Sequence, residues 1–489
     1  MGAAVRRGWI SHKLAVAGVF LAIVLGIVPT VPVRADPTVS GEWSAPFDLG
    51  VIGIDAALLP TGKVLLFSYP STELGSPARL FDPATGTTTD VSITMERDVF
   101  CGGHSLLPDG RFFVTGGHLP GTAFGFGAPE TDFFDPATET WSSGPVLDEA
   151  RWYPTNVPLA DGSTLIFGGD VTEQDPATTV ESYDPGSNTL TTLPASADRD
   201  LGLYPRMHLL TDGRIAWVNR AKTRTFDPDT NLWSTPVDTM NFGSRGETLS
   251  SVVLPGLNEV LVIGGANTQQ GTTATTEIID FSGSNPQWRY SGSMTAAREN
   301  GNAVLLPDGT VLMVGGGLGP TNYRNPVLFA ELYDPLTETW TVMDAQALPR
   351  MYHSTAILLP DGRVLSAGHD RGRPTSNQRS GEIFSPPYLF KGPRPTITSS
   401  PGSVGYGQQF EVTTPDASSI SRVALLSPGS VTHAIDMGQR YVDLSFSGSG
   451  TTLTLTSPAD GNVAPPGPYM LFILNAEGVP SVASWVQVG

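Results

Sequence analysis

Cysteine is almost absent from this sequence, since Cys101 is the one cysteine among 489 residues. A single cysteine excludes an internal disulfide framework, so the stability of the fold has to come from a buried apolar core. A lone cysteine is most often a small buried apolar residue. Packing is therefore the first interpretation of Cys101, and a chemical role needs support from other residues.

Positive charge is also scarce. The chain has 28 Lys and Arg residues against 47 Asp and Glu residues, which gives a formal net charge of −19 at pH 7. A surface this acidic repels the phosphate backbone of DNA and RNA. We therefore expect no nucleic-acid partner.

Long apolar runs are absent after the first 35 residues. The run from Leu14 to Val33 follows a basic segment and precedes Ala35, which indicates a signal peptide over residues 1–35. The run is also long enough to be an uncleaved membrane anchor, although two prolines in its last third favour cleavage. Both interpretations predict a secreted or cell-surface protein. Membrane contact is expected only if the N-terminal segment stays uncleaved, and then only through that segment.

Helical periodicity is scarce as well, whereas 55 Gly and 42 Pro residues indicate many turns. A unit of two apolar strands joined by a turn recurs seven times, as in "HSLLPDGRFFVTGGH" and "AVLLPDGTVLMVGGG". Each unit is followed by a tail such as "DFFDPATETW". Asp-Gly supplies the positive φ of a tight hairpin, and a period of about 50 residues is typical of kelch repeats. We therefore predict a seven-bladed kelch-type β-propeller over residues 36–392.

The ring of blades is predicted to close by joining its two ends. Several tails contain a tryptophan that we expect to pack between neighbouring blades: Trp141, Trp233, Trp288 and Trp340. The seventh tail, "EIFSPPYLF", has none, whereas the segment "GEWSAPFD" at residues 41–48 has one and stands before the first unit. This segment is the expected outer strand of the last blade.

Residues 393–489 do not continue the repeat. They alternate apolar and polar residues in short segments such as "QQFEVTT", "RVALLS" and "YMLFILNA". Six or seven short strands in a stretch of this length predict an immunoglobulin-like β-sandwich. The expected fold class is therefore all-β, a propeller followed by a sandwich.

A propeller hosts many functions, so a site has to be sought in residues that break the repeat. Cys101, Tyr153 and the adjacent pair Tyr352 and His353 stand on loops just before an innermost strand, and such loops converge at one end of the axis. His433 stands on a loop of the predicted sandwich. Taken singly, each residue is better explained by packing or solvation. The same plain interpretation applies to the other histidines of the mature chain, His104, His118, His208 and His369.

The chain resembles the copper radical oxidases, the family of galactose oxidase and glyoxal oxidase. The resemblance covers essentially the whole mature chain and is most specific in "DVFCGGHSLLPDG", "ARWYPTNVPLADG", "LYPRMHLLTDG" and "LPRMYHSTAILLPDGRV". It implies that Cys101 is bonded through sulfur to the ring of Tyr153. It also implies one copper ion with Tyr153, Tyr352, His353 and His433 as ligands.

The resemblance further implies an activity. A primary alcohol or hydrated aldehyde would be oxidised by O2 to an aldehyde or carboxylic acid, with hydrogen peroxide as the second product. Imidazole and phenolate ligands suit Cu(II). Because copper stores one electron and the oxidation removes two, the cross-linked Tyr153 would store the other as a radical, and Tyr352 would be the general base.

Two positions depart from the galactose oxidase pattern. Val171 stands where that enzyme has a tryptophan stacked on the cross-linked tyrosine, and Asn300 stands where it has a phenylalanine that contacts the substrate. We therefore expect the Tyr153 ring to lack an aromatic cover, and we do not expect galactose as substrate. The alternative function is a catalytically silent extracellular kelch protein that binds cell-wall polysaccharide or a protein. Joint retention of all five cofactor residues favours the oxidase.

Overall fold

The computed structural model describes residues 36–70, 75–94, 96–218, 221–318, 325–370 and 378–489. The predicted signal peptide, residues 1–35, lies outside the described residues. The single α-helix of the described part is α1 (Pro37–Ser40), and there are three short 3-10 turns, η1 (Gly246–Thr248), η2 (Pro387–Phe390) and η3 (Ala417–Ser419). No helix in these ranges combines the length and apolar character needed to cross a membrane. The predicted all-β class is confirmed.

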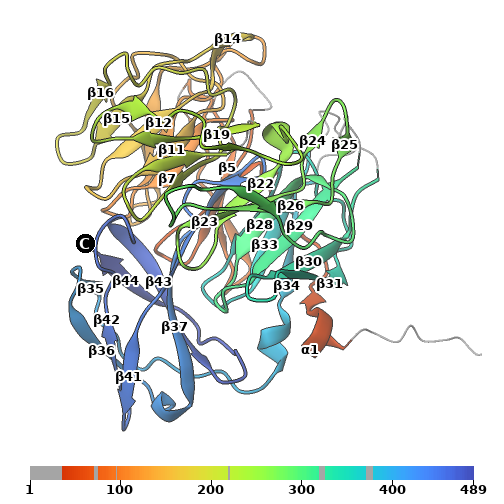
Figure 1. The fold of residues 1–489 in the computed structure, drawn as a ribbon, viewed down its shortest axis with the longest axis vertical. Helices are drawn as coiled ribbons and strands as arrows, with labels where there is room; N and C mark the ends of the chain where they lie inside the picture. Colours follow the sequence, from red (N-terminus) through yellow and green to blue (C-terminus); the bar gives the residue numbers. More distant parts are fainter. Residues whose placement is uncertain (1–35, 71–74, 95, 219–220, 319–324, 371–377) are drawn as a thin grey trace, which may run out of the picture. The chain divides into compact units, whose positions relative to one another are not determined.

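Seven antiparallel sheets follow one another along the described residues, and each contains a run of four strands that corresponds to one repeat (Figure 1). The apolar unit forms the two inner strands and the tail forms the two outer ones. This topology is consistent with the predicted seven blades. The first four blades consist of β3 (Asp55–Leu58), β4 (Val64–Phe67), β5 (Ala78–Asp82) and β6 (Thr87–Asp90); β7 (Gly103–Leu106), β8 (Phe112–Thr115), β9 (Thr131–Asp135) and β10 (Thr140–Ser143); β11 (Thr155–Pro158), β12 (Thr164–Phe167), β15 (Glu181–Asp184) and β16 (Thr189–Thr192); β17 (Met207–Leu209), β18 (Ile215–Trp217), β19 (Lys222–Asp227) and β20 (Leu232–Trp233), with β21 (Asp238–Thr239) beside β19.

The last three blades have the same order. They consist of β22 (Ser250–Val253), β23 (Glu259–Ile263), β26 (Thr276–Asp280) and β27 (Trp288–Tyr290); β28 (Glu299–Leu305), β29 (Val311–Gly317), β30 (Phe329–Asp334) and β31 (Thr339–Ala345); β32 (Ser354–Leu358), β33 (Val364–Gly368) and β34 (Ser380–Ser385) with β1 (Glu42–Trp43) and β2 (Phe47–Asp48). Two small hairpins project from the loops, β13 (Asp170–Thr172) with β14 (Asp175–Pro176) and β24 (Ala266–Asn267) with β25 (Gly271–Thr272).

The N-terminal segment closes the ring as expected. Strand β1 pairs antiparallel with β34, so the outer strand of the seventh blade comes from the start of the described chain. The indole Nε1 of Trp43 donates to the carbonyl of Asp344 in the sixth blade at 2.9 Å. The tail tryptophans likewise join blades, since Trp141 donates to Val91 and Trp288 to Thr223, both at 2.8 Å. Because the pairing of β1 with β34 joins residues far apart in sequence, it links the first and last segments of the propeller and closes the ring.

The C-terminal residues form two further sheets that gather in one body in Figure 1. Burial alternates along β36 and β42, as the alternating sequence predicted. The boundary at residue 392 remains a prediction. One sheet contains β35 (Ser403–Val404), β44 (Ser484–Val488), β43 (Gly467–Asn475), β37 (Ile420–Ser427) and β40 (Arg440–Asp443), and the other β36 (Gln409–Thr413), β42 (Thr452–Thr456) and β41 (Phe446–Ser449).

One hairpin from this C-terminal part joins the propeller. Strands β38 (Ser430–Thr432) and β39 (Ile435–Asp436) extend the first blade, because β38 pairs antiparallel with the innermost strand β3, with Thr432 opposite Asp55. The turn between them is His433-Ala434, and both residues have positive φ, 44° and 63°. Two positive φ values in a two-residue loop are typical of a type I′ turn. The tight turn therefore holds His433 at the tip of the hairpin, among the inner strands.

Candidate metal centre

The loop that precedes the innermost strand of each blade, which we call the inlet loop, carries most of the site. Cys101, Tyr153 and His353 each stand nine residues before the turn glycine of their blade. All three adopt the left-handed backbone region, with φ of 62°, 64° and 62°. Such a conformation costs a non-glycine residue of the order of 1–3 kcal/mol and persists only where the surroundings enforce it. The repeat therefore aims three different side chains at the axis with the same backbone turn.

Cys101 is fully buried. Its Sγ lies 3.8 Å from Nε2 of His433, and its carbonyl accepts a hydrogen bond from the backbone N–H of Tyr153 at 3.0 Å. Burial raises the pKa of the thiol well above its usual value, and the nearby carboxyl of Asp55 raises it further. The sulfur is therefore a protonated thiol, although the nearby Tyr153 phenol opposes part of this rise in its pKa.

The two tyrosines meet through their hydroxyl groups. The Tyr153 and Tyr352 hydroxyl oxygens lie 2.8 Å apart, although the residues come from the third and seventh blades. Burial, with the neighbouring Cys101 and Tyr352, raises the pKa of Tyr153 well above 10. Tyr352 is half-buried, and its ring stacks on that of His353 at a centroid distance of 3.9 Å. Deprotonation of Tyr153 therefore requires a positive charge beside it.

The hydrogen bonds of His433 determine which ring nitrogen faces the site. Its Nδ1 lies 2.6 Å from Oγ1 of Thr432, and that hydroxyl donates its own hydrogen to the carbonyl of Ile54 at 3.1 Å. Thr432 Oγ1 must therefore accept from His433 Nδ1–H, which leaves the Nε2 lone pair directed toward Cys101. Burial lowers the pKa of His433 well below 6.5, so the ring stays neutral, the form that binds metals.

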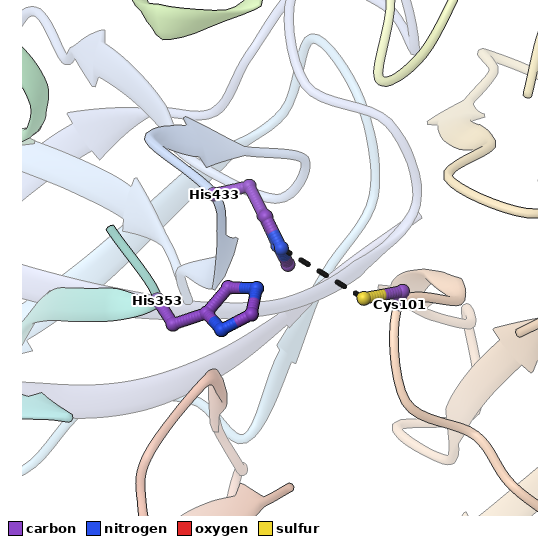
Figure 2. Close-up of side chains that lie close together, drawn as sticks. All are labelled: Cys101, His353 and His433. Atoms are coloured by element: carbon purple, nitrogen blue, oxygen red, sulfur yellow. Dashed lines mark hydrogen bonds between the residues drawn. The ribbon is translucent and has the colours of Figure 1, made fainter. Parts of the chain in front are cut away.

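His353 has a matching arrangement. Its Nδ1 lies 3.4 Å from Oδ2 of Asp370, a carboxylate that can only accept from an N–H. Its Nε2 is buried and has no hydrogen-bond partner in the described part of the chain. The ligand atoms of Cys101, His353 and His433 all lie within 4.8 Å of one another (Figure 2).

These donors fit a copper ion. Two neutral imidazoles present lone pairs, one of them on a buried nitrogen with nothing to bond, and two phenols lie beside them. Imidazole and phenolate donors suit Cu(II), and a carboxylate or hydroxyl behind each imidazole is the usual support of a metal ligand. The structure thus brings together all five residues that sequence reasoning selected.

The expectation that Tyr153 lacks an aromatic cover is wrong. Trp152 stacks on its ring at a centroid distance of 4.7 Å and 16°, and Tyr204 stacks at 4.5 Å and 23°. Rings this close and this parallel cannot share one face, so Tyr153 is covered on both. Val171 is only half-buried on β13, where its carbonyl accepts from Gly127 N–H. One of the two covering rings therefore belongs to Trp152, the residue that precedes Tyr153 in sequence, and the other to Tyr204.

Sequence reasoning missed Tyr204. It stands nine residues before Gly213, the same offset as the other inlet residues, and its φ is 41°. That offset is the signal that could have selected it. Asn300, nine residues before Gly309, is also buried with positive φ.

The remaining histidines do not join the metal centre. His104 is bound to Ser430 at 2.6 Å, and His208 to Ser251 at 2.8 Å. His118 packs against Trp152, with 5.4 Å between ring centroids. The group of possible metal ligands found among the described residues contains none of them, which is consistent with their plain interpretation.

Comparison with known proteins agrees with this geometry. The family model "Glyoxal oxidase N-terminus" matches residues 76–386, and "Galactose oxidase-like, Early set domain" matches residues 394–488. The chain is 31% identical to a galactose oxidase of Gibberella zeae over 92% of this chain and 70% of that protein. It is 34% identical to "Aldehyde oxidase GLOX" of Vitis pseudoreticulata over 80% of this chain and 82% of that protein. A solved fungal alcohol oxidase of the AA5 family, in complex with copper, superposes with a TM-score of 0.82 at 27% identity, covering 92% of this chain and 99% of that one.

Proposed function

The chain belongs to the glyoxal oxidase and galactose oxidase family of copper-dependent oxidases, and from this membership we propose that it oxidises a primary alcohol or hydrated aldehyde with O2 to an aldehyde or carboxylic acid plus hydrogen peroxide. The observation that carries the proposal is the meeting of two imidazole lone pairs, two phenols and one thiol at the inlet end of the propeller. A binding protein has no use for such a buried donor set. The non-catalytic kelch alternative therefore has no support, and secretion remains part of the proposal.

In this proposal Tyr153, Tyr352, His353 and His433 hold one copper ion. When bound, copper supplies a one-electron acceptor and a Lewis acid for the substrate oxygen. The positive charge of the ion would favour the phenolate forms of Tyr153 and Tyr352, the forms in which both would bind it. Asp370 and Thr432 hold the two imidazoles in the tautomer that presents Nε2.

Each of the remaining steps of the proposed reaction is assigned to a particular side chain. Cys101 and Tyr153 form a thioether that makes the Tyr153 ring easier to oxidise, so this ring stores one oxidising equivalent. The Tyr352 oxygen would take the hydroxyl proton of the substrate, and the Tyr153 oxygen would take a hydrogen atom from the carbon that bears that hydroxyl, while the remaining electron would go to the copper ion. The substrate thereby loses two electrons and two protons, and O2 receives two of each to become hydrogen peroxide. Tyr352 suits the role of base because it is half-buried and can contact a substrate.

The function is tested by peroxide release from copper-loaded protein with small aldehydes, glycolaldehyde-like compounds, sugars and benzylic alcohols. We expect peroxide with at least one of these classes and one carbonyl product per peroxide. Metal-free protein and Tyr352→Phe are the controls and should release none. Absence of peroxide across all classes, from protein that contains copper and has been treated with an oxidant, would refute the oxidase proposal.

The cover of Tyr153 leads to a prediction about its radical. Replacing Trp152 with leucine should speed the decay of the oxidised form by about 5- to 10-fold, because a stacked aromatic pair contributes about 1 kcal/mol and excludes water. Val171→Trp should leave the decay rate unchanged, since Tyr153 is already covered on both faces. The measurement is loss of radical absorption after chemical oxidation. Slower decay of the radical in Val171→Trp, with no effect of Trp152→Leu, would show that position 171 and not Trp152 protects the Tyr153 radical.

A further inference from the structure

The fourth blade supplies none of the proposed copper ligands, yet two of its residues bond to three segments that do carry the site. We propose that Tyr204 and Arg206 are positioning residues that hold the Cys101 segment, Tyr153 and the His433 hairpin in register. This inference rests on the proposed function for the identity of the metal. The contacts themselves are observed in the structure and do not depend on that identity.

Tyr204 reaches the first two segments. Its hydroxyl donates to the carbonyl of Gly102, the residue after Cys101, at 3.1 Å, and its backbone N–H donates to the carbonyl of Tyr153 at 2.7 Å. Its ring stacks on Tyr153 and lies 5.0 Å from the ring of His433. One buried side chain therefore sets the spacing between the thiol and the phenol that are proposed to join.

Arg206 reaches the third segment. Its fully buried guanidinium donates from Nη2 to the carbonyl of His433 at 3.0 Å and from Nη1 to the carbonyl of Tyr204 at 2.6 Å. The same group donates to the carbonyls of Glu247 at 2.7 Å and Leu249 at 2.9 Å in the next inlet loop. A planar guanidinium with five N–H donors can bridge these carbonyls at once, which the single ammonium of lysine cannot do.

Other buried arginines of the propeller have a different role, which makes Arg206 distinctive. Each of them pairs with a buried glutamate of its own blade and donates to the backbone carbonyl of a glycine in the second strand or just after it. These pairs are Arg151 with Glu181, Arg245 with Glu277, Arg298 with Glu331 and Arg350 with Glu382. They stabilise single blades, whereas Arg206 ties a blade to the inserted hairpin.

The hairpin needs such a tie because its tip is unusual. His433 and Ala434 both have positive φ, and the carbonyl of His433 is buried with its residue. Removing the Arg206 donor takes a hydrogen bond away from that buried carbonyl, and a buried carbonyl without a donor is unfavourable. The turn can avoid this cost by moving, and any movement displaces the His433 ring from His353 and Cys101.

The test compares Arg206→Lys with Arg245→Lys, a matched buried arginine that does not touch the hairpin. We expect Arg206→Lys to weaken Cu(II) binding by about 10- to 100-fold, the range for residues that support metal ligands, and to change the electron paramagnetic resonance parameters of the bound ion. In metal-free full-length protein, backbone amides of residues 430–437 should exchange faster than in wild type. Arg245→Lys should lower the melting temperature and leave affinity, spectrum and exchange at 430–437 unchanged.

Equal losses of copper affinity in the two lysine variants, or an unaltered spectrum in Arg206→Lys, would overturn the assignment. Tyr204→Phe gives an independent arm should Arg206→Lys not fold. It keeps the ring stack and loses the Gly102 bond, so copper-dependent loss of the Cys101 thiol should slow at least about 3-fold relative to wild type, within the 0.5–1.5 kcal/mol of one hydrogen bond. An unchanged rate contradicts the role of Tyr204. If the variants change copper binding as expected but the wild-type protein releases no peroxide, the oxidase proposal is wrong and the positioning role of Tyr204 and Arg206 stands.

Discussion

Replacing His433 with alanine is expected to weaken Cu(II) binding by at least about 100-fold, because loss of a ligand exceeds the 10- to 100-fold effect of losing a residue behind one. Peroxide release should fall below detection. The physical reason is that His433 supplies one of the two imidazole nitrogens of the proposed site. It does so from the tip of the β38–β39 hairpin, so no residue of a repeat loop can replace it. Metal analysis after dialysis and titration with a competing chelator measure the affinity, and paramagnetic resonance measures the loss of a nitrogen ligand.

The matched control is His208→Ala. His208 is a half-buried histidine of the propeller, bonded to Ser251, and loss of solvent around it lowers its pKa to about 3. It is not among the proposed ligands, so copper content and turnover should stay at wild-type values. Full copper occupancy with unchanged activity in His433→Ala would remove this residue from the ligand set.

Copper and O2 are expected to convert Cys101 and Tyr153 into a thioether without a second protein. The intact chain should lose two hydrogens, one from the thiol and one from the ring, with O2 as the oxidant. Cys101 should then stop reacting with thiol reagents even after unfolding. Cys101→Ser cannot form the bond, and its turnover should fall by about 1,000-fold, equivalent to about 4 kcal/mol in the barrier. Mass spectrometry and peroxide assays give these two results.

The structure explains why this pair should react. The thiol and the phenol are both buried, and burial raises the pKa of each, so both stay protonated until a metal ion is beside them. Reaction therefore waits for copper. Metal-free protein is the internal control and should keep an alkylatable thiol. An active, copper-loaded protein whose Cys101 still reacts with iodoacetamide would exclude the cross-link.

Much of the fold follows from local sequence. Each Asp-Gly turn and the apolar segments around it form a hairpin with few alternatives, since positive φ at the glycine and alternating burial act over a few residues. For the same reason the shared offset of nine residues before the turn glycine places Cys101, Tyr153 and His353 correctly. Repetition made these positions comparable, and Tyr204 obeys the same rule.

The cover of Tyr153 shows where local reasoning fails. Comparison with galactose oxidase places the covering tryptophan at position 171. The rings that cover Tyr153 instead come from Trp152 before the third blade and Tyr204 before the fourth blade. Trp152 pairs with Asp170 through two backbone hydrogen bonds of 2.7 and 2.8 Å, which fixes its ring beside Tyr153. Trp152, from the same loop as Tyr153, thus occupies the place that comparison by position assigns to residue 171.

The sequence alone predicted the blades and the inlet positions, because these depend on short-range turn and strand preferences repeated along the chain. The five candidate residues were predicted through the resemblance to a known family. The tertiary structure decided that the residues meet. Cys101 and His433 are 332 positions apart, and they come within 3.8 Å because β1 closes the ring and β38 enters it to pair with β3. Both pairings join strands that are distant in sequence, so they depend on the packing of the whole ring, which no local pattern encodes.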